Sequence, residues 1–352
     1  MNIQIQRYAL LALTAAALFG ASTPLAKLLL QGVSPLMLAG LLYLGSGIGL
    51  LMIRLVSGLV TPRNHGEPGI QRRDYPWLAA AVLLGGVCAP VLLMWGLNGS
   101  TAAGASLLLN LEGVFTALVA AALFREAVGL RVWLATFIML AGALLLSYDP
   151  ALAMRLSPHS LAVAAACLLW ACDNNLTRKI SANDPMTIAI VKGLVAGVVN
   201  IGLAWAVEPA TPAATVIAGA MLLGLFSYGI SLVMFIYALR HLGSARASAH
   251  FSTAPFMGAT ISILLLNDPG SIAFVFAVIL MICATWLVLT EHHQHQHTHS
   301  QMAHTHGHSH DEHHQHPHDG SEGAEPHAHA HTHSSLTHAH PHLPDIHHRH
   351  EH

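Results

Sequence analysis

An apolar stretch from Thr101 to Glu126 restricts the possible folds more than any other part of the chain. It reads TAAGASLLLNLEGVFTALVAAALFRE, close to the ~20 residues that cross the hydrocarbon core of a bilayer. Its first turns carry alanine, glycine and serine, which let membrane helices approach closely. Glu112 lies near its middle, where a charge is costly, so this carboxylate is a candidate functional group in a membrane helix.

A unit containing this stretch occurs twice in the chain. An offset of 142 residues places Asp268 on Glu126, and residues 239–287 align with residues 97–145 without a gap. Because alanine and leucine matches are common in apolar helices, the aligned acid that closes both segments is the stronger indication. The repetition predicts one membrane unit present in two copies.

Composition and hydropathy extend this prediction to the whole body of the chain. Of its 352 residues, 54% are hydrophobic and 9% are charged, against about 25% charged in a soluble domain. Ten apolar spans are predicted, at about 8–30, 35–57, 75–97, 101–126, 130–147, 159–179, 185–207, 213–239, 244–266 and 270–290. The first and sixth align at an offset of 151 residues, which places Asn174-Asn175 on Thr23-Pro24. The domains are expected at 1–147 (first five-helix repeat), 148–158 (linker), 159–290 (second five-helix repeat) and 291–352 (tail).

The distribution of lysine and arginine predicts the orientation in the membrane, since cytoplasmic loops carry the excess. With the N-terminus in the cytoplasm, Lys27 and Arg155 fall on the outer side. The inner side then holds Arg7, Arg54, Arg63, Arg72, Arg73, Arg125, Arg131, Arg178, Lys179, Arg240 and Arg246. Five spans per half is an odd number, so the two halves must be inverted, as in many transporters. The expected fold is therefore an all-α integral membrane protein of ten transmembrane helices in two inverted repeats, with both termini cytoplasmic and the inner membrane as its location.

The polar groups inside the spans are the candidate substrate-binding residues. They are Glu112 in the fourth span, the consecutive Asp173, Asn174 and Asn175 in the sixth, and His250 in the ninth. Three consecutive polar side chains cover about 300° of a helix, so some must face the interior of the bundle. The alternatives are a hydrogen-bonded packing role for Glu112 and His250, and a helix cap for the polar triplet.

Other residues within the spans receive structural assignments. Lys27 and Lys192 can extend toward an interface along their apolar stems, and substrate binding by either residue is the alternative. The four cysteines lie in apolar segments without paired spacing, which indicates buried thiols and disfavours a disulfide or metal cluster. No nucleophile–base pair, phosphate loop or cofactor fingerprint is present, so an enzyme is not expected, and no basic run or aromatic motif suggests nucleic acid.

Histidine dominates the C-terminal tail. The chain has 28 histidines, of which four precede residue 291 and 24 follow it, together with eight acidic residues. With almost no apolar residues, the tail is expected to be disordered. Alternate histidines can bind zinc, nickel or copper, and the candidate ligands are His304, His306, His308, His310, His313 and His314. The alternative is a solvated, pH-sensitive tail with no metal role, and no cofactor is expected to be required.

Four segments together resemble a known family of permeases. They read FGASTPLAK, NGSTAAGASLLLNLEGVFTALVAAALFRE, LLWACDNNLTRKIS and YALRHLGSARASAHFSTAPF. Their order is similar to that of the EamA-type ten-helix permeases of the drug/metabolite transporter superfamily. The tail, with THSQMAHTHGHSHDEHH and PDIHHRH, resembles a bacterial His-tailed subgroup. The chain departs from the family at Asn267-Asp268, where Gly-Glu is usual.

The resemblance implies export of a metabolite or amino-acid-like solute by alternating access, and it names no substrate. We expect a secondary transporter whose partners are the bilayer and a small-molecule substrate, with a homodimer as one option for its assembly. The alternative is a transition-metal transporter or metal-sensing membrane protein. A dedicated metal path would place several histidine, cysteine or carboxylate ligands in paired positions within the spans, and that pattern is absent from the sequence.

Overall fold

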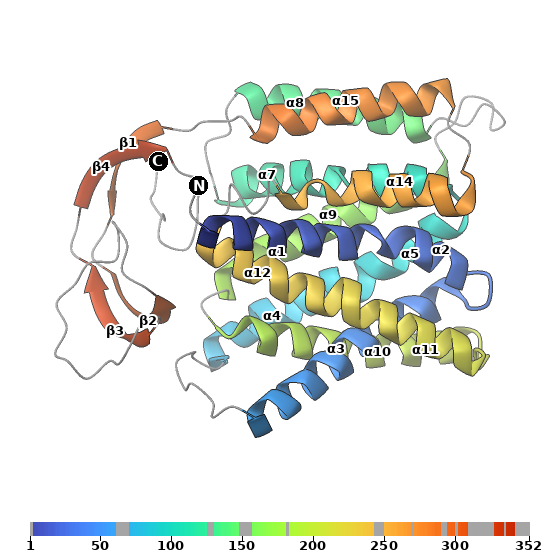
Figure 1. The fold of residues 1–352 in the computed structure, drawn as a ribbon, viewed down its shortest axis with the longest axis horizontal. Coiled ribbons are helices and arrows are strands. Elements are labelled where there is room, and N and C mark those ends of the chain that lie inside the picture. The colour runs from blue at the N-terminus through green and yellow to red at the C-terminus, as the bar shows by residue number, and fades with distance from the viewer. Residues whose placement is uncertain are drawn as a thin grey trace.

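The chain folds into a bundle of roughly parallel helices, shown in Figure 1 as a computed structural model. The structure describes residues 3–60, 70–124, 130–147, 157–180, 183–242, 250–268 and 271–289, and in the tail 294–299, 302–308, 327–333 and 336–341. The helices of the first half are α1 (Ile3–Gly20), α2 (Ser22–Leu29), α3 (Pro35–Val60), η1 (Arg72–Asp74), α4 (Tyr75–Ala81), η2 (Val82–Cys88), α5 (Ala89–Asn98), α6 (Ala102–Leu108), α7 (Leu111–Phe124) and α8 (Leu130–Ser147). Those of the second half are α9 (Pro158–Ile180), α10 (Pro185–Val207), α11 (Ala214–Leu223), η4 (Gly224–Ile230), α12 (Ser231–Leu242), α14 (Ala254–Leu266) and α15 (Ile272–Leu289).

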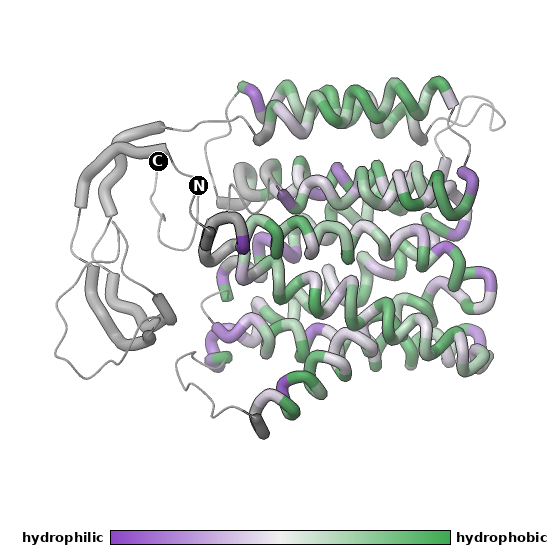
Figure 2. Tube along the Cα trace, in the orientation of Figure 1, coloured by the Kyte–Doolittle hydropathy of each residue, from purple (hydrophilic) through white to green (hydrophobic). Residues whose placement is uncertain are grey.

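Most of these helices are apolar along their length (Figure 2). Five segments are long and apolar enough to cross a membrane: 7–29, 35–57, 72–98, 185–207 and 214–235. Shorter apolar helices cover 102–116, 133–145, 254–266 and 272–287. The remaining helix, α9, has 23 residues and carries the polar triplet Asp173-Asn174-Asn175. The all-α, multi-span membrane fold predicted from the sequence is confirmed.

Helix packing follows the internal repeat. Contacts between equivalent helices of the two halves pair α3 with α10 and α8 with α15, and α6 of the fourth span packs on α14 of the ninth. The remaining pairs occur twice: α5 packs on α9 as α12 packs on α1, and α7 packs on α9 as α14 packs on α1. In Figure 1, α8 and α15 form a layer at one side of the bundle. This pattern is the one expected of two five-helix units related by a pseudo-two-fold axis.

Small residues permit the closest of these approaches. At the crossing of α3 and α10, a Cβ added to Gly193 would lie 2.5 Å from the backbone nitrogen of Gly47. A side chain larger than hydrogen therefore cannot be accommodated at this point without separating the helices. Because lipid tails are as apolar as leucine, close backbone packing of this kind provides much of the attraction between membrane helices.

Two π-helical turns interrupt the third and eighth spans. They cover Val82–Cys88 and Gly224–Ile230, so they have the same length and are 142 residues apart. This is the offset that aligns the two halves of the sequence. A π turn widens a helix and removes the regular pairing of backbone groups, and such turns occur frequently at functional sites.

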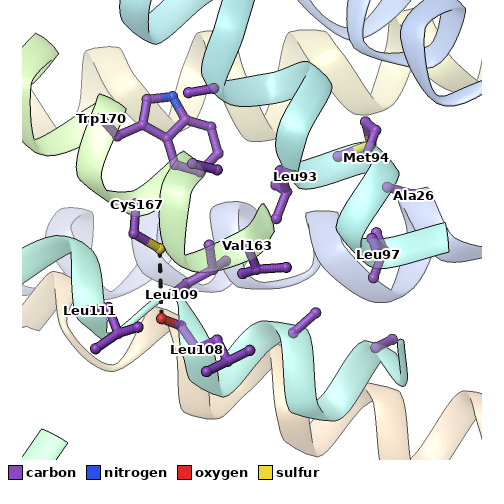
Figure 3. Close-up of a cluster of buried hydrophobic side chains, with 14 of the residues drawn as sticks. Ala26, Leu93, Met94, Leu97, Leu108, Leu109, Leu111, Val163, Cys167 and Trp170 are labelled. Carbon is purple, nitrogen blue, oxygen red and sulfur yellow. Dashed lines mark hydrogen bonds between the residues drawn. The ribbon is translucent and has the colours of Figure 1, made fainter. Parts of the chain in front are cut away.

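The largest cluster of buried apolar side chains lies where α5, α6 and α9 meet (Figure 3). Leu97 and Leu108 are at most 1% exposed, and Trp170 is 6% exposed. The Cys167 thiol points from α9 to the carbonyl of Leu108, at 3.6 Å. These contacts fix α9 against the first half of the chain, and the polar triplet lies one turn further along α9.

One end of the bundle, which carries residues 27–34, 98–102 and 267–268, is joined by a contact between the two halves. Asn267 ends α14 with a left-handed backbone (φ 52°), a conformation that asparagine tolerates better than most residues. The turn places Asp268 so that its Oδ2 accepts a hydrogen bond from the Ala103 backbone N–H at 2.9 Å. The start of the fourth span is thereby tied to the end of the ninth.

Two further polar contacts lie near the ends of the spans. At the same end, Lys27 Nζ donates to the carbonyls of Leu97 (2.7 Å) and Asn98 (2.9 Å), the last two residues of α5. At the opposite end, Arg54 Nη1 lies 2.9 Å from Asp184 Oδ2 and links α3 to the start of α10. Lys27 therefore caps a helix within the protein, where the sequence predicted an extension toward the interface.

The structure describes short segments of the tail. Its described parts are four strands, β1 (Gln294–His299), β2 (Met302–His308), β3 (His327–His333) and β4 (Leu336–Pro341). β1 pairs with β4 and β2 with β3, both antiparallel. The alternation of histidine with small or β-branched residues has the period of two that a strand requires.

Candidate functional site

The fourth and ninth spans are both interrupted near their middles. In the fourth, α6 ends at Leu108 and α7 begins at Leu111, and Asn110 Nδ2 donates to the carbonyl of residue 107 at 2.9 Å. In the ninth, a turn precedes α14, and the Thr253 hydroxyl donates to the His250 carbonyl at 2.7 Å. Each break is thus stabilised by a side chain that binds the carbonyl three residues earlier. Discontinuous helices at matching repeat positions commonly form the binding sites of transporters.

Glu112 lies in the first turn of α7, directly after the break in the fourth span. Its Oε1 accepts a hydrogen bond of 2.8 Å from Asn174 Nδ2 of α9. The same amide lies 3.4 Å from the hydroxyl of Thr116, which donates to the Glu112 carbonyl at 2.8 Å. Asn174 is exposed although it belongs to a predicted membrane span. Glu112 and Asn174 therefore form a polar contact between the two halves of the chain.

Asp173 takes part in a separate arrangement. Its Oδ2 lies 2.5 Å from Lys192 Nζ of α10, and its Oδ1 accepts a 3.0 Å hydrogen bond from Thr177. The side chains of Asp173 and Lys192 are 5% and 12% exposed, so the pair is buried. Gly85 leaves room for it, since a Cβ there would collide with the Asp173 carboxylate. The sequence signal for the role of Lys192 in this pair was its charge within an apolar span.

Asn175 completes the polar triplet and connects α9 to α7. Its Nδ2 lies 3.2 Å from the Thr116 carbonyl and 2.9 Å from the Ala171 carbonyl. The side chain is buried. Asn175 therefore holds the two helices in register, and its amide donors are used within the protein.

The π turn of the third span positions residues beside this cluster. The Gly85 carbonyl accepts hydrogen bonds from the Tyr43 hydroxyl (2.7 Å) and from Trp170 Nε1 (2.9 Å). Asn200 Nδ2 donates to the Gly86 carbonyl at 3.2 Å. These side chains satisfy backbone groups that the π turn leaves unpaired, which matters because the bilayer core offers no water. Tyr43 and Trp170 carried no signal of this role in the sequence.

His250 is not joined to the other predicted site residues. It lies next to the break in the ninth span, and its carbonyl accepts the Thr253 hydroxyl. Within the described ranges, its side chain makes no hydrogen bond to Glu112, Asn174 or Asp173. The predicted site is thus divided: Glu112 and Asn174 are in direct contact, Asp173 and Asn175 flank them, and His250 lies in the other half.

Three of the six predicted metal ligands lie in a described strand. His304, His306 and His308 of β2 stand opposite His331, His329 and His327 of β3. His310, His313 and His314 lie outside the described residues. In the part of the chain that the structure describes, no group of three or more histidine, cysteine or acidic side chains is arranged to hold a metal ion.

These features define a multi-span α-helical membrane protein built of two similar units, with an internal polar cluster between interrupted helices. Residues 6–148 and 158–290 each match the EamA-like transporter family. The chain belongs to this family, which confirms the resemblance found in the sequence.

Two individual proteins are similar to this chain. An uncharacterized transporter of Methanothermobacter thermautotrophicus (strain ATCC 29096 / DSM 1053 / JCM 10044 / NBRC 100330 / Delta H) is 29% identical over 289 residues, which are 78% of this chain and 84% of that protein. A crystal structure of another protein superposes with a TM-score of 0.58 at 19% identity, covering 80% of this chain and 95% of that one. The crystal structure supports the fold alone.

Proposed function

We propose that the protein is a secondary transporter that moves a small ammonium-bearing solute, such as an amino-acid-like metabolite, out of the cell by alternating access. The contact between Glu112 and Asn174 carries this proposal, because it joins the two halves of the chain near the middle of the fourth span. A group at this position can bind solute from either side as the halves move relative to each other.

The charges of the cluster support a cationic solute group. Asp173 and Lys192 neutralise each other at 2.5 Å. Glu112, by contrast, has the neutral amide of Asn174 as its hydrogen-bond partner within the described part of the chain. An ionised Glu112 would leave the cluster with one net negative charge, and a charge inside the membrane requires compensation. A protonated amine supplies it, and so does a proton when no solute is bound.

Replacing Glu112 with glutamine tests this function. The Glu112→Gln variant keeps the size of the side chain and an acceptor for Asn174 while removing the charge. We expect the purified variant to insert into liposomes normally and to lose uptake of cationic solutes. Glu208→Gln, at an exposed position beyond α10, is the matched control and should transport normally. Wild-type flux in the Glu112 variant would rule out an essential charge at this position.

We also propose that the protein resides in the inner membrane with both termini in the cytoplasm. The eleven-to-two bias of lysine and arginine supports this orientation. A reporter that is active only in the periplasm, fused after residue 290, should remain inactive. Strong activity of that fusion would contradict the orientation.

The tail is proposed to bind zinc, nickel or copper on the cytoplasmic side. Its support is compositional, from 24 histidines after residue 290, and structural, from the facing histidines of β2 and β3. In this proposal the tail buffers or senses metal and the helical body carries the organic solute.

A further inference from the structure

Charged residues of the candidate site have uncharged equivalents in the other half of the chain. The 142-residue offset of the π turns places Ala254 on Glu112. The 151-residue offset of the first and sixth spans places Ser22 on Asp173. α3 and α10 both begin with a proline, at 35 and 185, and this offset of 150 residues places Leu42 on Lys192.

The contacts between helices follow the same correspondence. α7, which carries Glu112, packs on α9, and α14, which begins with Ala254, packs on α1 just before the break that precedes Thr23. Gly20 lies against Ala254, since a Cβ there would collide with the Ala254 carbonyl oxygen. At these equivalent positions the fourth, sixth and seventh spans carry charged residues, and the first, second and ninth spans carry Ser22, Leu42 and Ala254. We call these the charged half and the uncharged half of the site; the ninth span also carries His250, beside its break.

Thr23 shows the consequence of this asymmetry. Its equivalent, Asn174, donates a hydrogen bond to Glu112. Thr23 is 1% exposed, and its hydroxyl has no hydrogen-bond partner among the described residues. A carboxylate is missing at the position that corresponds to Glu112, because Ala254 occupies it. A second cationic group would find no counter-charge in this half.

Aromatic rings surround the uncharged half instead. The ring centroid of Phe19 lies 5.8 Å from that of Tyr228 and 5.6 Å from that of Phe251. Phe251 also stacks on Phe235 at 4.4 Å. All four residues are half-buried, and their rings form one apolar cluster. Burial of apolar ligand surface contributes roughly 25 cal/mol per Å² before the costs of binding.

We propose that the solute is an amphipathic monocation, with one ammonium group bound by Glu112 and an apolar body packed against the uncharged half. This inference rests on the proposed function and restricts its substrate class to amines without a carboxylate, so that a free zwitterionic amino acid is excluded. It excludes diamines and polyamines, because their second charge would be transferred from water to the surroundings of Leu42, Thr23 and Ala254. It also excludes acids without an amine, which the carboxylate of Glu112 would repel.

Three probes of equal chain length test the proposal on the full-length protein in nanodiscs: n-hexylamine, 1,6-diaminohexane and hexanoate. We expect hexylamine to bind at least about tenfold more tightly than either of the others, since an uncompensated charge within a membrane protein costs more than the 1.4 kcal/mol that a tenfold difference requires. Equal or tighter binding of the diamine, or binding of hexanoate at the level of hexylamine, would overturn the proposal.

Ala254→Glu gives a gain-of-function test. The new carboxylate can accept the free Thr23 hydroxyl, as Glu112 accepts Asn174, and it creates a second anionic position. The preference for hexylamine over the diamine should then fall by at least about tenfold. Ala254→Gln has a similar volume and no charge, so it should leave the preference unchanged. An unchanged preference in a folded Ala254→Glu protein contradicts the inference, and the wild-type comparison decides it if that variant fails to fold.

The outcomes separate this inference from the function on which it rests. If no amine binds, or if amine binding persists in Glu112→Gln, the cation site itself is refuted. If hexylamine and the diamine bind equally and both require Glu112, the cation site stands and the asymmetric division into charged and uncharged halves is refuted.

Discussion

Asp173 and Lys192 form an ion pair whose side chains are only 5% and 12% exposed. Removing one partner of a buried pair leaves an uncompensated charge and costs about 3–5 kcal/mol, whereas replacing both with apolar groups is often neutral. Lys192→Met alone should therefore lower the thermal stability of the protein in detergent markedly. Combining it with Asp173→Asn should restore most of that stability.

The pair of Arg54 and Asp184 serves as the control for this measurement. Its side chains are 34% and 19% exposed, so water already screens the interaction. Exposed pairs contribute about 0–1 kcal/mol, so Arg54→Met should lower the thermal stability only slightly. Removing Asp184 as well should not restore the stability that is lost. Failure of the Asp173–Lys192 double variant to recover stability would show that the pair has a role beyond charge compensation.

Gly85 provides a second test at the level of single residues. Gly85→Ala places a methyl group in contact with the Asp173 carboxylate and should displace it from Lys192. Gly202 of α10 is the matched control, because nothing lies within 4 Å of an added Cβ there. Gly202→Ala should be neutral or stabilising, since alanine favours a helix over glycine by about 1 kcal/mol. Equal thermal stability of the two variants would contradict the packing described here.

The sequence predicted individual polar groups better than their partners. Glu112 and the triplet at 173–175 stand out because ionisable and amide side chains are rare in apolar runs. Their partners could not be derived, because Lys192 reaches Asp173 only through the relative rotation of α9 and α10. That rotation depends on packing between the helices, and no local pattern encodes it.

At the scale of elements, the spans and the repeat were predictable and the interruptions of the helices were not. Hydropathy identified the body of each span, and the 142-residue offset reappears in the two π turns. The π turns themselves depend on side chains from other helices, such as Tyr43 and Trp170, which bind the exposed Gly85 carbonyl. The local sequence determines helix propensity, but it does not indicate which side chains of other helices donate hydrogen bonds to such a carbonyl.

We expect the hydrogen bond from the Ala103 N–H to Asp268 to keep one end of the bundle closed. The proposed alternating access would require the fourth and ninth spans to separate at this end, and this bond would then break. Asp268→Ala should increase labelling of a Ser106→Cys protein by an impermeant maleimide added from that side. About a tenfold rise is expected, since a hydrogen bond to a charged group contributes about 1.5–3 kcal/mol.

Two variants make the labelling result specific to this contact. Asp268→Asn keeps an acceptor oxygen and should label more slowly than Asp268→Ala. Glu208→Ala removes an exposed acid between α10 and α11 and should leave the rate unchanged. Equal rates for Asp268→Ala and Glu208→Ala would show that closure of this end does not depend on Asp268.

At the scale of the whole molecule, the helical body and the tail have different physical bases. The body is held together by close packing, as at Gly47 and Gly193, and by buried polar pairs. The tail has few apolar residues and contributes no described contact to the core clusters. The body should therefore fold and transport without residues 291–352.

Metal binding by the full-length protein should depend on pH through the tail. Imidazole must be neutral to bind a transition metal, and its ordinary pKa is about 6.5. Protons therefore compete increasingly as the pH falls below this value, so zinc affinity should be high at pH 7.5 and should fall steeply toward pH 5.5. Equilibrium zinc binding measured on full-length and truncated protein provides the comparison, and retention of most zinc sites after truncation would place them in the body.

Solute flux measured with and without zinc then assigns the role of the tail. If it buffers metal, deleting residues 291–352 abolishes zinc binding and leaves flux unchanged. If it regulates transport, zinc alters flux in the full-length protein and the truncated protein loses that response. If metal is the cargo, truncation lowers metal flux at limiting zinc and organic amines are not carried. The last outcome would overturn the cation site proposed at Glu112. That site was assigned to an organic ammonium group because the charge of Glu112 is not compensated within the cluster.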